Sequence, residues 1–333
     1  MIRIGFIGLG NMGMYQVRAF AQAAGCRIAA GVDPAPEMRA RFGQDYPDAQ
    51  LFATPQEMLA QGQVDGVVIA VPTGYHQAVA STVLAAGVPV LLEKPMARTV
   101  AQCQQIIEDA ARANTLLMVA HCRRFDPHWL SWGDYVTTGK LGAPILWRDA
   151  RAHVHANNWF MDDALGGGPL IDGAIHNYDF ANLVFGEPES VYTAALKLNP
   201  DFTAIDTGST VIRYRAGHQL LISWSWAARG NSLADVIGPN GYIQFGTGGV
   251  PVDEDEKGRT LYCCFTDASG EKTLIKAAGT FTDMYIRQAE HFLACIRGET
   301  TCQSPGAEAI KAVAVAEAVL RSGRVGTVQE IRW

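Results

Sequence analysis

The chain has 333 residues, of which 48% are hydrophobic and 18% are charged. This composition supports a large core and excludes a disordered chain, and the length is typical of two domains of ordinary size. The net charge is −6, and no stretch combines many Lys and Arg residues with aromatic residues. Nucleic acids and anionic membranes are therefore not expected as main partners.

The sequence carries no pattern that directs export. Met1 is followed at once by IRIGFIGLG, which lacks a basic start and a cleavage site. No apolar run approaches the roughly 18 residues of a membrane span. The seven cysteines are odd in number and irregularly spaced, without a CxxC motif. We therefore expect free thiols and a cytoplasmic protein.

The first 122 residues alternate between short apolar runs and helical patterns. Strands buried on both faces and joined by helices indicate a parallel sheet with right-handed crossovers. Thr54 and Thr99 are expected to cap two of the helices. The predicted strands are 2–8, 27–33, 64–72, 88–92 and 116–125, and the predicted helices are 11–24, 36–42, 55–61, 75–87 and 99–114.

The pattern changes after the sixth apolar run, so we place a domain boundary at residue 122 and a second domain over 123–333. Trp224 and Trp226 alternate with serines, which is typical of a half-buried antiparallel strand and predicts an exposed face suited to a homodimer or homotetramer. DEDEK (253–257) reads as a solvated hairpin. The predicted strands are 144–155, 189–199, 208–215, 218–227, 242–246, 260–265 and 272–277, with helices at 284–298 and 305–323.

A glycine motif lies between the first strand and the first helix. Gly8, Gly10 and Gly13 form G-x-G-x-x-G, which allows a tight turn and a close approach of the backbone to a diphosphate at the helix N-terminus. Asp33 ends the second strand, where a carboxylate binds the adenosine ribose of NAD. The same carboxylate repels the 2′-phosphate of NADP, and Arg39 lies farther on. NAD is therefore the favoured cofactor.

A cluster of polar residues follows a run of three glycines in LGGGPLIDGAIHNYDF. Asp172, His176 and Asp179 are spaced i, i+4 and i+7, which places them on one face of a helix. A carboxylate beside an imidazole orients the ring and raises its basicity, as removal of a proton from an alcohol requires. The alternative is a helix whose polar groups are satisfied by its neighbours.

A second reactive group ends the buried strand in VPVLLEKPMA (88–97). Ligands of open α/β sheets bind outside the carboxyl ends of the strands, and Lys94 lies at such an end. Its ammonium group can stabilise the negative charge that develops on a substrate oxygen. A salt bridge with Glu93 is the weaker explanation, because adjacent strand residues point to opposite faces.

Three stretches together, GLGNMG, EKP and GGGPLIDGAIHNYD, resemble the Gfo/Idh/MocA family of glucose–fructose oxidoreductases and inositol dehydrogenases. The resemblance covers essentially the whole chain. It implies an α/β fold with an N-terminal Rossmann domain and a C-terminal α+β domain whose large, mostly antiparallel open sheet often mediates oligomers. It also implies an NAD(P)-dependent dehydrogenase that acts on sugars, cyclic polyols or related hydroxyl compounds.

The resemblance further implies roles for individual residues. Lys94 and His176 would be the catalytic pair, with Asp172 binding substrate or supporting His176, and the Lys94–Pro95 peptide would be cis. His121 and Arg123 or Arg124 would lie near the nicotinamide, and His121 would touch substrate. The residues expected at the cofactor are Gly8, Gly10, Asn11, Met12, Gly13, Asp33, Val71, Pro72, Thr73, His76, Glu93, Lys94, Arg124 and Trp159.

Two further groups were weighed for the substrate site. His153 and His155 share one face of a predicted strand. Their residue types would allow a metal site, with Asp149 or Cys122 as a further ligand. We expect no metal, and instead expect His153 and Asn157 to touch substrate hydroxyls. Tyr285 is a weaker substrate candidate, since a core position explains it equally well.

The sequence thus predicts an NAD-dependent dehydrogenase that oxidises a secondary hydroxyl of a sugar, sugar acid or cyclic polyol. Two alternatives stay open. One is an NAD-dependent glycosidase of the same family, which oxidises its sugar only transiently. The other is a regulator that senses NAD without catalysis, which the presence of Lys94, Asp172 and His176 disfavours.

Overall fold

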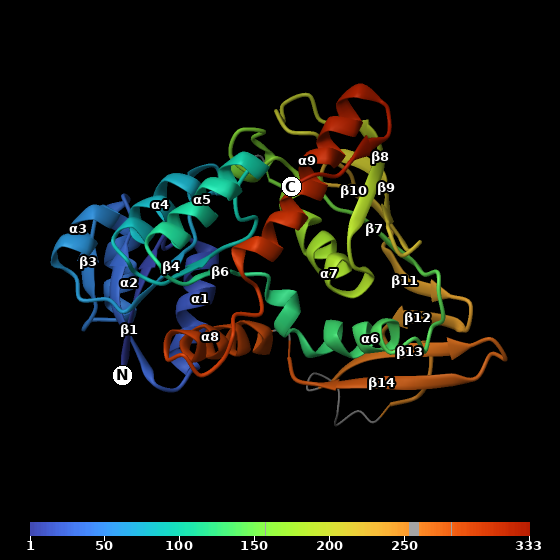
Figure 1. Cartoon of the computed structure of the whole chain (residues 1–333), viewed down its shortest axis with the longest axis horizontal. Helices are drawn as coiled ribbons and strands as arrows, with labels where there is room; N and C mark the ends of the chain where they lie inside the picture. The colour runs from blue at the N-terminus through green and yellow to red at the C-terminus, as the bar shows by residue number, and fades with distance from the viewer. Residues whose placement is uncertain (157, 253–259, 281) are drawn as a thin grey trace. The chain divides into compact units, whose positions relative to one another are not determined.

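The computed structural model describes residues 1–156, 158–252, 260–280 and 282–333 and divides into two compact units (Figure 1). The first unit is Met1–Cys122 with Met284–Ile310, and the second is Arg123–Asp283 with Lys311–Trp333. The hairpin predicted at 253–257 and the candidate Asn157 lie outside the described residues.

The first unit is built on a six-stranded parallel sheet in the order β3-β2-β1-β4-β5-β6. Every residue of β4 and β5 is buried, which explains why these strands read as continuous apolar runs. The order reverses between β1 and β4, so the carboxyl ends of these strands flank a switch point. The strands are β1 Ile2–Ile7, β2 Cys26–Val32, β3 Gln50–Phe52, β4 Gly66–Ile69, β5 Val90–Leu92 and β6 Leu117–Val119.

The helices between these strands begin as the sequence predicts. Thr54 forms a capping box with Glu57, and the Thr99 side chain accepts a hydrogen bond from the Gln102 N–H. Gly87, with φ of 72°, follows the end of α4. The helices are α1 Asn11–Gln22, α2 Pro36–Asp45, α3 Pro55–Gln61, α4 His76–Ala85 and α5 Val100–Arg112.

One helix of the first unit comes from far along the chain. Helix α8 (Asp283–Ile296) packs against α1, where the rings of Phe292 and Phe20 lie 6.2 Å apart, and against Gly66 of β4. The sequence analysis placed this helix in the second domain. The structure groups it with the first, because the apolar face of α8 is buried there.

The second unit contains a nine-stranded sheet in the order β14-β13-β12-β11-β7-β10-β9-β8-β15. Only β7 and β10 pair in parallel, so the predicted, mostly antiparallel sheet is confirmed. Strand β11 was not predicted, because LADVIG is short and carries a glycine. The strands are β7 Leu146–Ala152, β8 Pro188–Leu196, β9 Thr207–Tyr214, β10 Gln219–Ser225, β11 Leu233–Gly238, β12 Gly241–Phe245, β13 Thr260–Asp267, β14 Lys272–Ala278 and β15 Gln329–Glu330.

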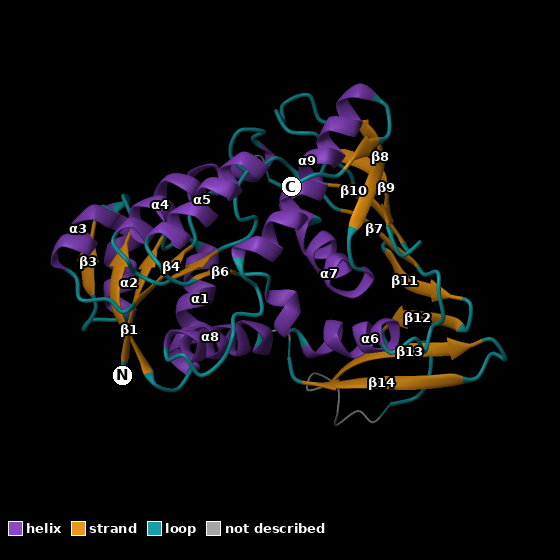
Figure 2. Ribbon diagram, viewed as in Figure 1, coloured by secondary structure: helices purple, strands orange, loops and turns teal. Residues whose placement is uncertain are grey.

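Helices cover one face of this sheet (Figure 2). They are α6 Pro127–Thr137, α7 Ile175–Phe185 and α9 Gly306–Val325, which begins in the first unit. Trp132, Trp147 and Phe180 are fully buried between helices and sheet, with ring centroids 4.9–6.5 Å apart. These aromatic contacts form the core of the second unit.

The expectation that Trp224 or Trp226 lies on an exposed sheet face is wrong. Both side chains are buried, at 7% and 6% exposure, and their rings lie against Gly173. On the opposite face of the sheet the large exposed apolar residues are Tyr192, Leu196, Leu233 and Tyr242. The alternation of Trp and Ser along the strand was predicted correctly. The sequence did not indicate which face of the sheet the helices cover.

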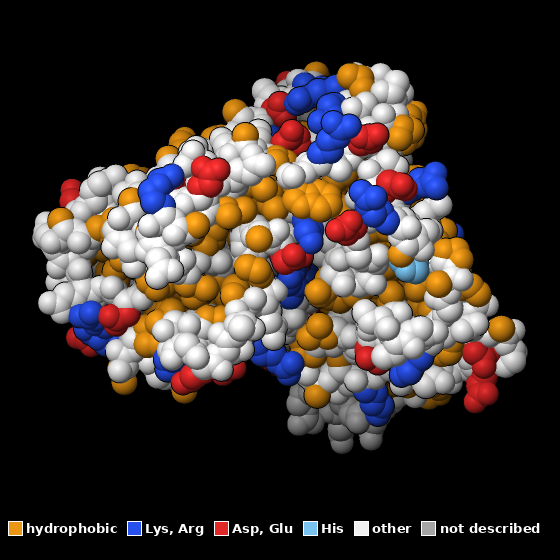
Figure 3. All heavy atoms as spheres, viewed as in Figure 1, with side chains coloured by type: hydrophobic (Ala, Val, Ile, Leu, Met, Phe, Trp, Pro, Cys, Tyr) orange, Lys and Arg blue, Asp and Glu red, His pale blue; other side chains and the backbone are white. Residues whose placement is uncertain are grey.

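The surface carries both signs of charge side by side on the face that Figure 3 shows. Arg324 pairs with Asp163 at 3.0 Å, and Arg332 pairs with Glu330. All seven cysteines are free thiols. Among the helices in the described part of the chain, none is long and apolar enough to cross a membrane.

Candidate active site

The carboxyl edge of the first sheet collects the predicted cofactor residues. The turn after β1 holds Gly8, β2 leads to Asp33, β4 leads to Val71 and β5 leads to Glu93. These strands are neighbours in the order β2-β1-β4-β5, so the four positions follow one another along one edge. A ligand that spans this edge reaches from Asp33 to the residues after β5.

The glycine turn has two glycines that no other residue can replace. A Cβ on Gly13 would lie 1.9 Å from the Gly8 carbonyl oxygen, because α1 starts directly against the turn. Gly8 itself has φ of +88° and lies against the Ala70 carbonyl. Gly10 is different: a Cβ there would meet nothing within 4 Å. The protein around Gly10 would therefore accept a larger residue. A cofactor that approaches the backbone closely at this position would explain why a glycine is present.

Asp33 is oriented by the backbone around it. Its Oδ2 accepts a hydrogen bond from the Leu9 N–H and its Oδ1 accepts one from the Ala35 N–H, both at 2.9 Å. Each oxygen keeps a further lone pair for a ribose hydroxyl. The Arg39 guanidinium donates to the carbonyl oxygens of Asp33 and Pro34 at 2.6 and 3.0 Å. The carboxylate is thus fixed at the end of β2.

A cavity of about 560 Å³ opens beside Asp33. Its walls are mostly apolar, as a purine ring requires, and Asp33 lies among the lining residues, as the ribose requires. The Thr73 hydroxyl is buried nearby and has no hydrogen-bond partner among the described residues. The chain therefore fits a dinucleotide here. The lining residues are Ile7, Gly8, Val32, Asp33, Pro34, Ala53, Thr54, Pro55, Val71, Pro72, Tyr75, Ala78 and Val79.

The turn after β5 is held by its own carboxylate. Glu93 is 5% exposed; it accepts a hydrogen bond from the Gln16 side chain at 2.6 Å and from the Lys94 backbone N–H at 3.1 Å. The Lys94–Pro95 peptide is cis, as expected. Gln16 is fully buried on α1, and its Oε1 has no partner within the described residues. Sequence analysis missed Gln16, although a glutamine on the apolar stripe of α1 was a visible signal.

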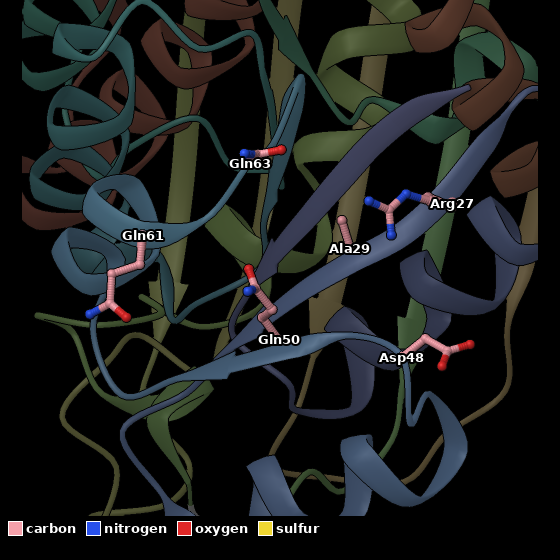
Figure 4. A pocket seen from close by; sticks show the side chains of 6 residues that line it. All are labelled: Arg27, Ala29, Asp48, Gln50, Gln61 and Gln63. Carbon is pink, nitrogen blue, oxygen red and sulfur yellow. The ribbon is translucent and has the colours of Figure 1, made fainter.

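A second hollow in the first unit lies away from this edge. It has a volume of about 250 Å³ and is lined by Arg27, Asp48, Gln50 and Gln61, among others (Figure 4). Arg27 lies near the amino end of β2 and Gln50 begins β3, so the hollow is on the side opposite to Asp33. Ligand sites of such sheets lie at the carboxyl edge, and we assign it no function.

The second unit presents Asp172 and His176 around the start of α7. The helix begins at Ile175, and residues Pro169–Gly173 form a π-helical turn before it. Asp172 therefore lies in the turn and not on the helix face with His176, which corrects the predicted i, i+4, i+7 arrangement. Asp172 is 5% exposed, whereas His176 is half-buried.

One contact joins this turn to α7, and two hold it against the sheet. The Tyr178 hydroxyl donates to the Leu170 carbonyl at 3.0 Å, and burial raises the pKa of Tyr178. A Cβ on Gly173 would lie 2.5 Å from the Trp224 ring and 2.8 Å from Trp226. The turn therefore rests directly on two indole faces, and only a residue without a side chain fits at Gly173.

Asp149 of β7 anchors the helix that follows. Its carboxylate is almost fully buried and accepts hydrogen bonds from Asn177 at 3.1 Å, from Trp224 at 2.9 Å and from both ends of the Arg151 guanidinium at 2.7 Å. Asn177 is the neighbour of His176. The carboxylate that sequence analysis weighed as a metal ligand is thus engaged in structural hydrogen bonds.

Arg124 and Asp179 form a second anchor. Their side chains are almost fully buried and joined by two hydrogen bonds of 2.9 and 2.7 Å. Asp179 therefore serves as the partner of Arg124, and Asn177 and Asp179 hold the first turns of α7 from two sides. The predicted contact of Arg124 with the cofactor stays a prediction.

The remaining candidates are spread over both units. In the first, His121 is fully buried and Tyr285 stacks on Tyr15 at 6.2 Å. In the second, Trp159 lines a hollow of about 290 Å³ with Asp162, Asp201 and Thr203. His153 is exposed after β7, and its ring lies 6.3 Å from that of His155.

His153 and His155 lie around Trp226, with ring distances of 5.8 and 4.8 Å. Partial burial, together with the nearby His155 and Arg151, lowers the pKa of His153. No group of three or more potential metal ligands gathers anywhere in the described ranges. The neutral imidazole of His153 can both donate and accept hydrogen bonds, as contacts with hydroxyl groups require.

A Rossmann sheet with an acidic residue after β2, joined to a unit with a broad antiparallel sheet, defines a dinucleotide-dependent oxidoreductase. Comparisons support this class. Residues 2–121 match the model of an oxidoreductase family with an NAD-binding Rossmann fold, and residues 133–244 match that of the GFO/IDH/MocA C-terminal domain. The chain belongs to the Gfo/Idh/MocA family and uses NAD as cofactor.

Individual relatives cover nearly the whole chain. Inositol 2-dehydrogenase 1 of Saccharopolyspora erythraea is 28% identical over 99% of this chain and 96% of its own. The rhizopine catabolism protein MocA of Rhizobium meliloti is 26% identical over 95% and 93%. A levoglucosan dehydrogenase, solved with NADH and levoglucosan, has a TM-score of 0.85 at 19% identity over the full length of both chains, which shows the shared fold.

Proposed function

We propose that this protein is an NAD-dependent dehydrogenase that oxidises a secondary hydroxyl of a sugar, sugar acid or cyclic polyol. One observation carries the proposal: Lys94 lies in the turn after β5, at the same sheet edge as the Asp33 pocket and the glycine turn. Dehydrogenases that act on inositol are among the relatives of this chain, which supports a polyhydroxylated substrate.

The proposed cofactor contacts divide along the edge. The glycine turn and the N-terminus of α1 would hold the diphosphate, since their free N–H groups and the helix dipole favour an anion. Asp33 would accept hydrogen bonds from the adenosine ribose. Glu93, fixed by Gln16, would hold the ribose at the other end. When bound, NAD supplies the carbon that accepts the hydride of the substrate.

The proton chemistry would belong to two side chains. His176 would take the proton of the substrate hydroxyl on its imidazole, and the Lys94 ammonium would stabilise the negative charge on that oxygen. Asp172 would bind a hydroxyl of the substrate or support His176. His121, His153, Asn157 and Tyr285 are the further proposed substrate contacts, and Trp159 and Arg124 the further proposed cofactor contacts.

The test is a panel of inositols, aldoses, sugar acids and glycosides, followed by the absorbance of reduced nicotinamide with NAD and with NADP. We expect reduction of NAD with at least one polyol or sugar. Lys94→Ala and His176→Ala should each lower kcat by about 10²–10⁴-fold and leave NAD binding in place. The double variant should be little worse than either single variant, because the two groups act on one oxygen.

Lys197→Ala is the matched control, because Lys197 is an exposed lysine after β8 and should leave turnover unchanged. Two results would contradict the proposal. One is full turnover by His176→Ala. The other is tight NAD binding with no reduction across the panel, and release of an aglycone from a glycoside would then identify a glycosidase instead.

We further propose a cytoplasmic homodimer or homotetramer that associates through the open sheet face. The support is the set of exposed apolar side chains, Tyr192 and Leu196 on β8, Leu233 on β11 and Tyr242 on β12, on the face that the helices leave uncovered. Light scattering should give a multiple of the chain mass, and Tyr192→Glu with Leu233→Glu should reduce it. A monomer in the unmodified protein would refute this arrangement.

A further inference from the structure

His76 lies in a hydrogen-bond arrangement that a neutral histidine cannot satisfy. It is the first residue of α4 and is 1% exposed. Its Nδ1 lies 2.8 Å from the Pro95 carbonyl oxygen, and its Nε2 lies 2.8 Å from the Val71 carbonyl oxygen. A carbonyl oxygen only accepts, so both ring nitrogens have to donate.

A neutral imidazole carries one N–H and one bare lone pair. In either tautomer, one of the two contacts would bring that lone pair to within 2.8 Å of a carbonyl oxygen, which is a repulsive approach. Only the imidazolium has two N–H groups and satisfies both distances. We propose that His76 is held as an imidazolium that ties the end of β4 to the Lys94–Pro95 turn and thereby positions Lys94.

The charged groups on the helices beside α4 have to be compared with a positive charge on His76. Glu57 on α3 is bound to the N–H groups of Ala53 and Thr54, and Asp109 on α5 is bound to Ser81, Gln105 and Arg112. Two further charged residues belong to the same region: Glu108 lies on α5, and Arg98 lies just before the start of α5.

The turn after β5 contributes Glu93 and Lys94. Glu93 comes two residues before Pro95; its carboxylate is buried and accepts hydrogen bonds from the Gln16 side chain and from the Lys94 backbone N–H. The N-terminus of α4 disfavours a cation, and Lys94 repels one. Two short charge-assisted hydrogen bonds together with the buried Glu93 carboxylate outweigh these opposing effects.

This arrangement changes the role expected for His76. The sequence analysis placed it against the cofactor, yet both of its nitrogens are committed to carbonyl groups on either side of the site. Val71 lines the Asp33 cavity, and Pro95 follows Lys94 directly. His76 is therefore a positioning residue: it joins the cofactor-binding end of β4 to the turn that carries the lysine. This inference rests on the proposed function of Lys94.

The protonation state is measured directly by ¹⁵N NMR of the histidine rings in the unmodified protein, with His76→Gln used to assign the signal. At about pH 8, above the ordinary pKa of histidine, we expect both nitrogens of His76 to be protonated. His218 and His291 are internal controls, since each has a ring nitrogen that accepts a backbone N–H, from Ile145 and Gln303. A neutral His76 signal at this pH would overturn the proposal.

Kinetics test the positioning role. His76→Gln provides donors at one end only and should lower kcat about 100-fold, with NAD affinity nearly unchanged. His76→Lys keeps the charge and has donors for both carbonyls, so it should recover most of that loss. His218→Gln is the matched control in the second unit and should leave kcat unchanged.

The outcomes separate the two hypotheses. Unchanged kcat in His76→Gln, or no rescue by lysine, would overturn the positioning role while the dehydrogenase function stands. Full activity of Lys94→Ala would instead refute the proposed role of Lys94, and the NMR signal would still decide the charge on His76.

Discussion

Asp33 is the residue that should decide cofactor choice. Its two oxygens are oriented by the Leu9 and Ala35 N–H groups, and each retains a lone pair for a ribose hydroxyl. Asp33→Ser should weaken NAD binding by about 1.5–3 kcal/mol, the value of a hydrogen bond to a charged group. That corresponds to about 10–100-fold in Kd. Removal of the charge should improve NADP, because Arg39 lies beside the same strand end.

The measurement is the ratio of kcat/KM for NAD and NADP in the unmodified protein and the variant. Arg41→Ala is a suitable control, since Arg41 is exposed on α2. A ratio that does not move would show that Asp33 does not contact the ribose.

Single residues differed in how well sequence predicted them. Gly8, Asp33 and Lys94 belong to local patterns that place them just after strands, and the structure has them there, with Gly13 in the first turn of α1. The structural role of Asp149 was not predicted, because its three partners come from β7, β10 and α7, and such convergence leaves no mark in local spacing.

The turn between Pro169 and Gly173 depends on one missing side chain. Gly173→Ala would place a methyl group 2.5 Å from Trp224 and 2.8 Å from Trp226, and neither ring has a flexible end that can move aside. Overpacking of this kind costs about 1–3 kcal/mol. The turn should shift and carry Asp172 with it, so activity should fall together with thermal stability.

Thermal unfolding and kcat measured on the same preparation check this result. Combining Gly173→Ala with Trp226→Leu, which makes room, should restore part of the stability. A Gly173→Ala protein that is as stable and active as the original would mean that the indoles do not support the turn.

Helix α7 is hydrogen-bonded to the sheet at two positions, one next to His176 and one farther along the helix. Asn177→Ala removes one of several donors to the buried Asp149 carboxylate and should cost about 1.5–3 kcal/mol, the value of a hydrogen bond to a charged group. It should also alter the pH dependence of kcat, because His176 is the adjacent residue. Asn182→Ala removes the contact with the Tyr214 hydroxyl five residues farther along α7 and should affect stability alone.

Pre-steady-state turnover over a range of pH separates these variants. Equal effects of Asn177→Ala and Asn182→Ala on the pH profile would argue against a special role of the first turn of α7.

Elements with strong local signals were predicted, and those that depend on distant contacts were not. Strands β4 and β5 of the first sheet are apolar on both faces, so their existence was evident, although both are shorter than predicted. Strand β3 was not predicted, because it has only three residues and two of them are exposed. The π-helical turn before α7 was read as part of the helix, because Asp172 and His176 fit helical spacing. Its real cause is the packing of Gly173 on two tryptophans of β10 and its continuation.

At the scale of the whole molecule, stability should fall as the solution becomes acidic. Burial lowers the pKa of His218 and of His291, so both stay neutral in the folded chain. The unfolded chain binds protons at these histidines below about pH 6.5, so the part of the folding stability that depends on these two rings is complete above that pH and declines below it. A His76 imidazolium adds stability only as the pH falls toward that value, so the melting temperature should decrease between about pH 6 and 5.

His218→Gln should flatten this decline, because it removes one of the two buried rings. A second loss is expected below about pH 4, where Asp65, whose pKa is lowered by the hydrogen bond from Arg3, takes up a proton. A melting temperature that declines just as steeply in His218→Gln as in the unmodified protein would contradict the assignment of a neutral His218 in the folded chain.

The first unit is assembled from two distant stretches of chain, and this affects how the protein is made. Helix α8 covers Phe20 and Gly66, yet it is translated only after the whole of residues 123–283. At ordinary rates of synthesis that delay is about 10–30 s. During this interval the nascent Rossmann sheet has an uncovered apolar face on the ribosome, so a shortened product that ends at residue 122 should require a chaperone to stay in solution.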